Sequence, residues 1–154
     1  MGVRLRPLRE EEFAEWRRRS RDGYAREMIE SGGFPEAEAR EKARGDFAGL
    51  LRDGLATPGQ AVFALEDDPS GERVGNLWLV ERRDALAVFD IHVDEALRGR
   101  GYGRAAMLLA EDEARRRGLR RIDLNVFAGN AVARTLYGSL GYEERSVYMS
   151  KSLS

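Results

Sequence analysis

The chain has 154 residues, with 26 basic and 27 acidic side chains and a formal net charge of −1. This length predicts one domain over residues 1–154, and the balanced charge argues against a nucleic-acid-binding protein. With no cysteine and a single histidine, disulfides, cysteine nucleophiles and zinc sites are not expected. The sequence shows no signal peptide and no apolar run of about 20 residues, so a cytoplasmic protein without membrane contact is expected.

The first third of the chain predicts one strand and two helices. Residues 3–6 alternate between apolar and charged side chains, which predicts a short strand that stops at Pro7. Apolar residues at helical spacing over 13–28 predict a first helix. Pro35 suits the first turn of a second helix, which is expected to end near Gly54.

The rest of the chain predicts strands interleaved with helices. Three strands separated by turn signals are expected to form an antiparallel meander. The whole pattern predicts a mixed α/β fold, in which a single layer of sheet carries packed helices. In chain order, strands are predicted at 61–66, 73–81 and 85–93, then a helix to Arg117, a strand at 121–127, a helix after Asn130 and a last strand at 142–150.

The most informative stretch is Arg98-Gly-Arg-Gly-Tyr-Gly103, which follows a strand and opens a helix. Glycine lets the backbone approach a ligand, and a helix start offers free N–H groups and a positive dipole end. Together they predict a phosphate or pyrophosphate site, although a tight turn alone could also use these glycines. A Walker A loop is excluded because Arg104-Ala105 stands where Lys-Ser/Thr is required. A dinucleotide fingerprint fits only loosely, because residues 94–98 separate the strand from the loop.

Two motifs resemble the signatures of the GNAT superfamily of acyl-CoA N-acyltransferases. Arg98-x-x-Gly101-x-Gly103 resembles its pyrophosphate-binding loop, and Asn130-Ala-Val-Ala133-Arg-Thr-Leu136-Tyr137 resembles its second signature helix. The order of elements matches as well, so the resemblance covers nearly the whole chain. It implies a central, mostly antiparallel twisted sheet flanked by about four helices in the order βααβββαβαβ. It also implies acetyl-CoA as cosubstrate, an amine acceptor and no metal.

The same resemblance implies where the coenzyme binds. Backbone amides of the glycine-rich loop would hold the pyrophosphate, and the backbone of residues 91–93 would pair with the pantetheine arm and place an N–H near the acetyl oxygen. Asn125 and Asn130 would line the arm, although a helix N-cap explains Asn130 equally well. The residues implied in the coenzyme site are Ile91, His92, Val93, Arg98, Gly99, Arg100, Gly101, Tyr102, Gly103, Arg104, Asn125, Asn130, Ala133 and Tyr137.

Tyr137 would be the general acid that protonates the departing thiolate, or else an ordinary core residue. The general base departs from the family pattern, because the matching strand positions are the apolar Ala87 and Phe89. Strand alternation places Asp90 on the face opposite Phe89, which makes it a candidate base. A carboxylate paired for structural reasons fits Asp90 equally well.

His92 and Glu81 are weaker candidates for the base. The sequence thus predicts an N-acetyltransferase that moves an acetyl group directly to an amine, since the usual covalent route lacks a cysteine nucleophile. The alternatives are a non-catalytic acyl-CoA sensor and a dinucleotide-binding oxidoreductase. The acceptor is a small-molecule or peptide amine whose identity the sequence does not give. Many family members form homodimers, but the sequence leaves the oligomeric state of this chain open. Candidate wall residues of the acceptor site are Tyr24, Glu27, Trp78 and Glu81.

Overall fold

A computed structural model gives the structure of the protein and describes residues 2–153. Two short 3-10 turns, at Gly54–Ala56 and Glu95–Leu97, accompany the strands and helices. The strands are β1 (Val3–Pro7), β2 (Gln60–Asp67), β3 (Arg73–Arg82), β4 (Ala85–Val93) and β5 (Arg121–Leu124). The helices are α1 (Glu10–Glu30), α2 (Glu36–Leu50), α3 (Tyr102–Arg116) and α4 (Ala131–Ser139).

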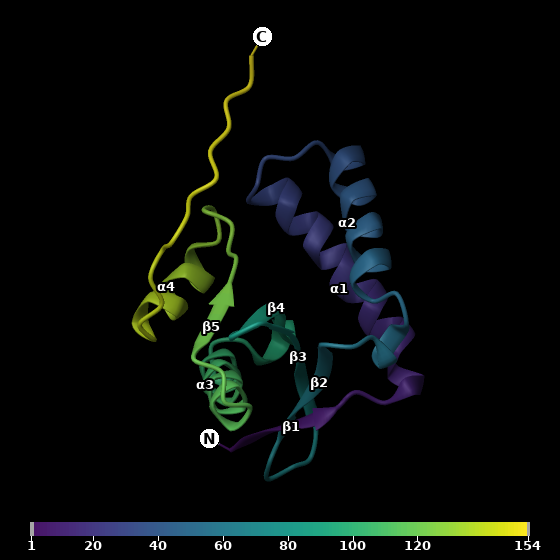
Figure 1. Ribbon diagram of the computed structural model, residues 1–154, viewed down its shortest axis with the longest axis vertical. Helices are drawn as coiled ribbons and strands as arrows, with labels where there is room; N and C mark the ends of the chain where they lie inside the picture. Colours follow the sequence, from purple (N-terminus) through teal and green to yellow (C-terminus); the bar gives the residue numbers. More distant parts are fainter. Residues whose placement is uncertain (1, 154) are drawn as a thin grey trace.

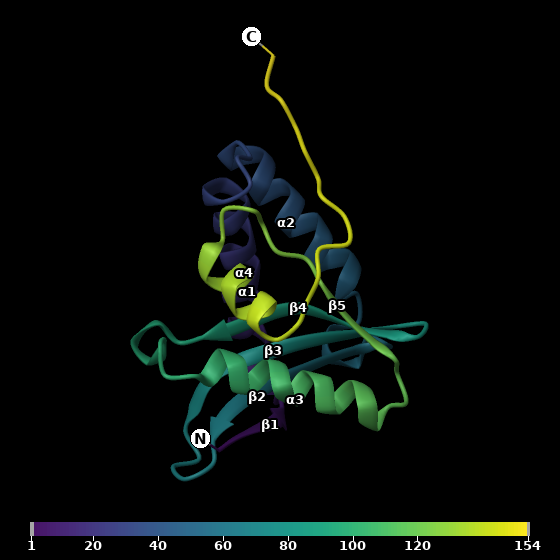
Figure 2. The same cartoon turned by 90° about the vertical axis from the view of Figure 1, so that its left-hand side faces the viewer.

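The strands form one sheet in the spatial order β1-β2-β3-β4-β5 (Figures 1 and 2). Neighbours from β1 to β4 are antiparallel, whereas β5 is parallel to β4 and is reached through the α3 crossover. The predicted turn between β2 and β3 is closed by Gly71, whose N–H donates to the Asp67 carbonyl at 2.7 Å. Gly71 has a φ of 73°, which glycine adopts without strain. The predicted mixed, mostly antiparallel fold is confirmed.

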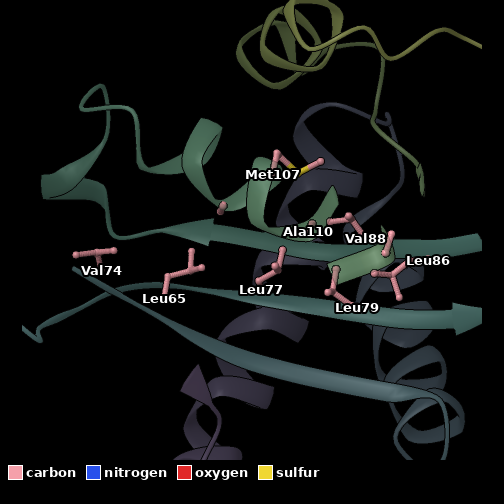
Figure 3. Close-up of a cluster of buried hydrophobic side chains, with 10 residues drawn as sticks. Leu65, Val74, Leu77, Leu79, Leu86, Val88, Met107 and Ala110 are labelled. Carbon is pink, nitrogen blue, oxygen red and sulfur yellow. The ribbon is translucent and has the colours of Figure 1, made fainter. Parts of the chain in front are cut away.

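Helix α3 covers one face of this sheet. Its buried residues Ala106, Met107, Ala110 and Ala114 recur at helical spacing and pack on leucine and valine side chains of β2, β3 and β4 (Figure 3). The small alanines let the helix lie close to the strands, and Met107 fills the remaining space. Each fully buried leucine there, such as Leu77, contributes about 2 kcal/mol of transfer free energy. This core fixes the start of α3 beside the end of β4.

Helices α1 and α2 cover the other face of the sheet (Figure 1). They contact it through aromatic side chains. The ring of Trp16 in α1 meets Trp78 of β3 edge-on at 5.4 Å between centroids. Trp78 also packs against Phe47 of α2 at 5.1 Å and Phe89 of β4 at 5.3 Å. Such pairs contribute about 0.5–1.5 kcal/mol each beyond the area they bury. This cluster fixes α1 across β4, which brings Ser20 over the strand.

The last predicted strand, at 142–150, is wrong, because the structure has no strand there. After α4, residues 143–153 are exposed and leave the body as an extended segment (Figures 1 and 2). A strand forms only by pairing, and within the described residues this segment has no strand beside it. The preceding strand is also shorter than expected, since β5 ends at Leu124 instead of Phe127. In the described residues no helix is long and apolar enough to cross a membrane.

Candidate active site

Strands β4 and β5 separate halfway along β4. They pair only over Ala85–Val88 and Arg121–Leu124, and β4 continues alone to Val93. Along residues 89–93, β4 pairs with β3 on one edge, while its other edge has no strand partner in the described chain. Figure 2 shows the chain after β5 leaving the sheet. Backbone N–H and C=O groups on such a free edge can bind an extended ligand.

A β-bulge sits where the two strands separate. Leu79 pairs with Val88, but Trp78 pairs with Asp90, so Phe89 is an extra residue in β4. The expectation that Asp90 lies opposite Phe89 is therefore wrong, because the bulge turns both side chains toward α1. Phe89 packs on Trp78, and the Ser20 hydroxyl of α1 donates to the Asp90 carboxylate at 2.6 Å.

The glycine-rich loop ends where α3 begins. Gly99 and Gly101 have φ values of 78° and 90°, in the left-handed region that strains other residues. Gly101 is the N-cap of α3 and has no side chain to occupy the free N–H groups of the first turn. Gly103 has an ordinary φ, and a Cβ there would lie 3.6 Å from the Leu136 side chain, at normal contact distance. The helix start is thus an uncapped, positively polarised anion site.

Four other loop residues were expected in the coenzyme site. The Arg98 side chain donates to the Val93 carbonyl at 2.9 Å, and Arg100 is exposed. Arg104 is exposed too and donates to the Ser139 hydroxyl of α4 at 2.6 Å. The Tyr102 hydroxyl donates to Asp67 at 3.3 Å, so this residue offers only its backbone to the loop. The three arginines add positive charge around the helix start.

Helix α4 begins at Asn130, and the structure confirms the helix N-cap predicted there. Its side-chain oxygen accepts a hydrogen bond from the Ala133 N–H at 3.1 Å. The Asn130 side chain also lies close enough to the Glu27 carboxylate of α1 to oppose the rise in its pKa. The other asparagine, Asn125, is exposed just past the end of β5, on the side where the strands separate. Neither position requires a ligand.

Three titratable groups from three elements influence one another beside the bulge. Burial raises the pKa of Asp90 to about 6, and the nearby Glu27 carboxylate raises it further while the Ser20 hydrogen bond lowers it. Burial also raises the pKa of Glu27. The pKa of Tyr137 in α4 rises to about 12, first because of burial and then because of the Glu27 and Asp90 charges. The site thus holds a carboxylate that accepts protons near neutral pH and a phenol that keeps its proton.

Sequence reasoning missed Ser20, which holds the Asp90 carboxylate in place. A small polar residue in the middle of an apolar helix face was the available signal. His92 also faces α1, and its pKa is lowered by burial and by the Arg19 guanidinium. Ile91 instead packs on the α3 side of the sheet, so it offers the site only its backbone.

Of the four expected acceptor-wall residues, only Glu27 joins this group. Trp78 is wrong as a wall residue, because it is 2% exposed within the aromatic cluster. Glu81 is wrong both as a wall residue and as a base, because it lies at the far end of β3, opposite Leu86, and pairs with Arg117 at 3.2 Å. The Tyr24 hydroxyl donates to Asp46 of α2 at 3.3 Å, which places its polar end between the two helices.

The sequence profile of the acetyltransferase (GNAT) family matches residues 8–142. The chain is 32% identical to the uncharacterized N-acetyltransferase YycN of Bacillus subtilis over 99% of this chain and 100% of that protein. The crystal structure of the B. subtilis protein superposes with a TM-score of 0.92 at 31% identity, covering 99% of both chains.

A more distant structure shares the fold. It is the PaiA N-acetyltransferase of Thermoplasma acidophilum in complex with coenzyme A. It superposes with a TM-score of 0.72 at 14% identity, covering 96% of this chain and 94% of the other.

Proposed function

The chain belongs to the GNAT family of acyl-CoA-dependent N-acyltransferases, and we propose that it transfers an acetyl group from acetyl-CoA directly to an amine. The observation that carries this proposal is the open edge of β4, which carries Asp90 and leads through residues 94–101 to the uncapped start of α3; the charge of Asp90 also raises the pKa of Tyr137 in α4. Residues 1–154 act as one domain in this proposal, since one sheet positions every group of the site.

The chain offers the features that coenzyme A requires. The start of α3 presents free N–H groups to a pyrophosphate, and the left-handed Gly99 and Gly101 let a ligand approach the backbone closely. The free edge of β4 over residues 89–93 can pair with the amide groups of the pantetheine arm. Exposed Arg98, Arg100 and Arg104 surround the helix start and favour a polyanion.

Asp90 is the general base in this proposal. An amine with a pKa near ~10 is protonated at neutral pH and must lose a proton before it attacks. Asp90, with a pKa of about 6, is ionised at pH 7 and more basic than an ordinary aspartate. The Ser20 hydroxyl orients its carboxylate, and Glu27 supplies a second negative charge nearby. Two carboxylates favour a cationic amine as the acceptor.

Tyr137 is the general acid. Acetyl-CoA supplies an acetyl thioester, and its C–S bond breaks as the amine nitrogen bonds to the carbonyl carbon. The thiolate that leaves takes the proton of the Tyr137 hydroxyl, which stays protonated at neutral pH because its pKa is about 12. A backbone N–H of residues 91–93 donates to the acetyl oxygen, a contribution worth about 3 kcal/mol in comparable sites. No covalent acyl-enzyme is formed, in keeping with a chain that has no cysteine.

Two measurements test this function. Acetyl-CoA is expected to raise the Tm while NAD and ATP leave it unchanged, because only the first ligand fits both the helix start and the free strand edge. A panel of small cationic amines and peptide N-termini, scored by release of free coenzyme A, then identifies the acceptor. Tight acetyl-CoA binding without turnover of any amine would show a non-catalytic acyl-CoA sensor and not an enzyme. Stabilisation by NAD alone would refute acetyl-CoA as the ligand.

A further inference from the structure

A cavity of about 190 Å³ lies between the first half of α1 and the start of β3. None of its lining residues in the described chain belongs to β4, to the glycine-rich loop or to α4. Pockets for drug-sized ligands measure about 300–1,000 Å³, so this cavity suits a smaller molecule. Its polar lining residues include Glu11, Glu15, Trp16, Arg19, Arg73 and Asn76.

Two arginines converge in this cavity. The guanidinium groups of Arg19 and Arg73 both donate to the side-chain oxygen of Asn76, Arg73 at 3.2 Å. Asn76 is 2% exposed, and its amide nitrogen donates to the Phe63 carbonyl at 3.2 Å, which holds the oxygen in place. Burial and then the Arg73 charge lower the pKa of Arg19. One neutral oxygen therefore holds two like charges together, an arrangement that an anion would stabilise.

The lining offers more hydrogen-bond donors than the described chain uses. Arg73 pairs with Asp94 at 3.0 Å, whereas Arg19 forms no ion pair within residues 2–153. The indole N–H of Trp16 is buried and also has no hydrogen-bond partner among these residues. Buried donors without an acceptor are uncommon in native proteins. The carboxylate of a ligand suits this lining, because a guanidinium group binds a carboxylate through two parallel hydrogen bonds.

Two glutamates bring the opposite charge to the same cavity. Glu11, Glu15 and Arg19 follow one another at intervals of four residues, so they lie along one stripe of α1. Glu15 has the spacing that favours an ion pair with Arg19, yet the guanidinium group bonds to Asn76 instead. The carboxylates of Glu11 and Glu15 thus remain available to a cationic group. A ligand that carries both an ammonium and a carboxylate matches the two kinds of charge.

We propose that this cavity is a second binding site, separate from the catalytic centre, and that it takes a free α-amino acid with a small or aliphatic side chain. The carboxylate of the amino acid binds Arg19 and Arg73. Its ammonium binds Glu11 and Glu15, and its side chain lies against the Trp16 ring. An amino acid is favoured over a simple anion because guanidinium and carboxylate groups line the same small cavity.

The amino acid in this cavity is not the amine acceptor. Ser20 contacts Asp90, and Glu15 precedes Ser20 by five residues, about 7.5 Å along the helix axis. The ammonium therefore lies on the side of Arg19 that is directed away from Asp90 along α1. The site does not depend on the proposed acetyl transfer, so its occupancy can be measured without acetyl-CoA.

Calorimetric titration of the full chain with L-alanine, L-valine and L-leucine, in the absence of acetyl-CoA, tests the site. Saturable binding of at least one of these amino acids is expected. The N-acetyl derivative and the methyl ester of the same amino acid each lack one charge and are expected to bind roughly tenfold more weakly, or worse. No binding of any of the three amino acids, or equal affinity for either derivative, would overturn the proposal.

Variants on α1 locate the binding. Arg19→Gln and Glu15→Gln should each weaken it roughly tenfold or more. Glu15 is exposed, so its variant keeps the fold. Arg18→Gln is the matched control, because Arg18 is exposed, pairs with Asp22 at 4.0 Å and does not line the cavity. Asp90→Asn should also keep the wild-type affinity. Binding that is lost in Asp90→Asn and kept in Arg19→Gln and Glu15→Gln would place the amino acid in the catalytic centre and overturn the proposal.

Discussion

Residues 8–114 contain every buried side chain of the described chain, whereas residues 115–153 contain none. The first region has three hydrophobic clusters, one on each face of the sheet and a third between α1 and α2. In the second region, β5 and α4 pack only through partly buried residues such as Leu136 and Leu140. The first region is therefore stabilised by its own core. We infer that the packing of the second region is completed by the molecule that binds to it.

The proposed active site lies on the boundary between these regions. Asp90 and Glu27 belong to the well-packed region, while Tyr137 belongs to the loosely packed one. A ligand that lies along β4 and touches α4 would thus join the two. Changes on either side of this boundary should affect activity and stability differently.

Asp90→Asn should have the largest effect, lowering kcat by roughly 10²–10⁴ near pH 7, the range for a general base. The loss should shrink at high pH, where more of the amine is free. The pKa of about 6 in the folded protein exceeds the ordinary aspartate pKa of 3.8, so the wild type loses stability as pH rises from about 4 to about 6. Asparagine avoids this loss, so at pH 8 the variant should melt no lower than wild type.

A lower Tm of the variant, together with a rate loss of the same size at every pH, would show that Asp90 has a structural role and is not the base. Asp46→Asn on α2 is the control.

Tyr137→Phe should lower kcat by roughly 10–10³ and leave the Kd for acetyl-CoA and the Tm nearly unchanged. The ring keeps its packing, and only the proton donor is lost. Tyr142→Phe is the matched control, because it removes a neighbouring hydroxyl that bonds to Glu111 instead. Steady-state kinetics of both variants decide the question, and full activity in Tyr137→Phe would return that tyrosine to a packing role.

Gly101→Val should weaken acetyl-CoA binding at least tenfold, about 1.4 kcal/mol. Valine is strained at a φ of 90°, and its side chain would cover the free N–H groups at the start of α3. Gly71→Val imposes a similar strain in the β2–β3 turn, where φ is 73°. Calorimetric titration should show weaker binding only in the first variant. Equal affinities in the two folded variants would place the pyrophosphate site elsewhere.

Glu12→Gln should have the smallest effect and should act on the well-packed region alone. Hydrogen bonds from Arg6 at 2.9 and 3.0 Å lower the pKa of Glu12 to about 2, below the ordinary glutamate pKa of 4.5. Its contribution, about 1 kcal/mol for a partly exposed pair, is present above pH 4.5 and is lost as pH falls toward 2. Urea unfolding at pH 7 and pH 2.5 measures it. An altered affinity for acetyl-CoA would show that the regions are not independent.

Much of the fold could be predicted because each element carries its own periodic pattern. The meander, the α3 start and the Asn130 cap all depend on neighbouring residues and turn signals. The bulge at Phe89 could not be predicted, because one extra residue leaves no mark in composition and yet reverses the face of Asp90. Strand alternation also does not show which side chains a helix covers. For this reason Trp78 was expected in the acceptor wall, although α1 and α2 bury it in the aromatic cluster. The strand at 142–150 failed because a strand forms only by pairing, and no strand lies beside this segment in the described residues.

Amide hydrogen exchange with and without acetyl-CoA tests the central claim most directly, namely that the coenzyme binds along the open edge of β4 and at the start of α3. Protection from exchange is expected over residues 89–93 and 98–105 and in α4. No change is expected in β1 and β2, which lie at the opposite edge of the sheet. Bound acetyl-CoA that protects other segments and leaves residues 89–105 unchanged would contradict the account.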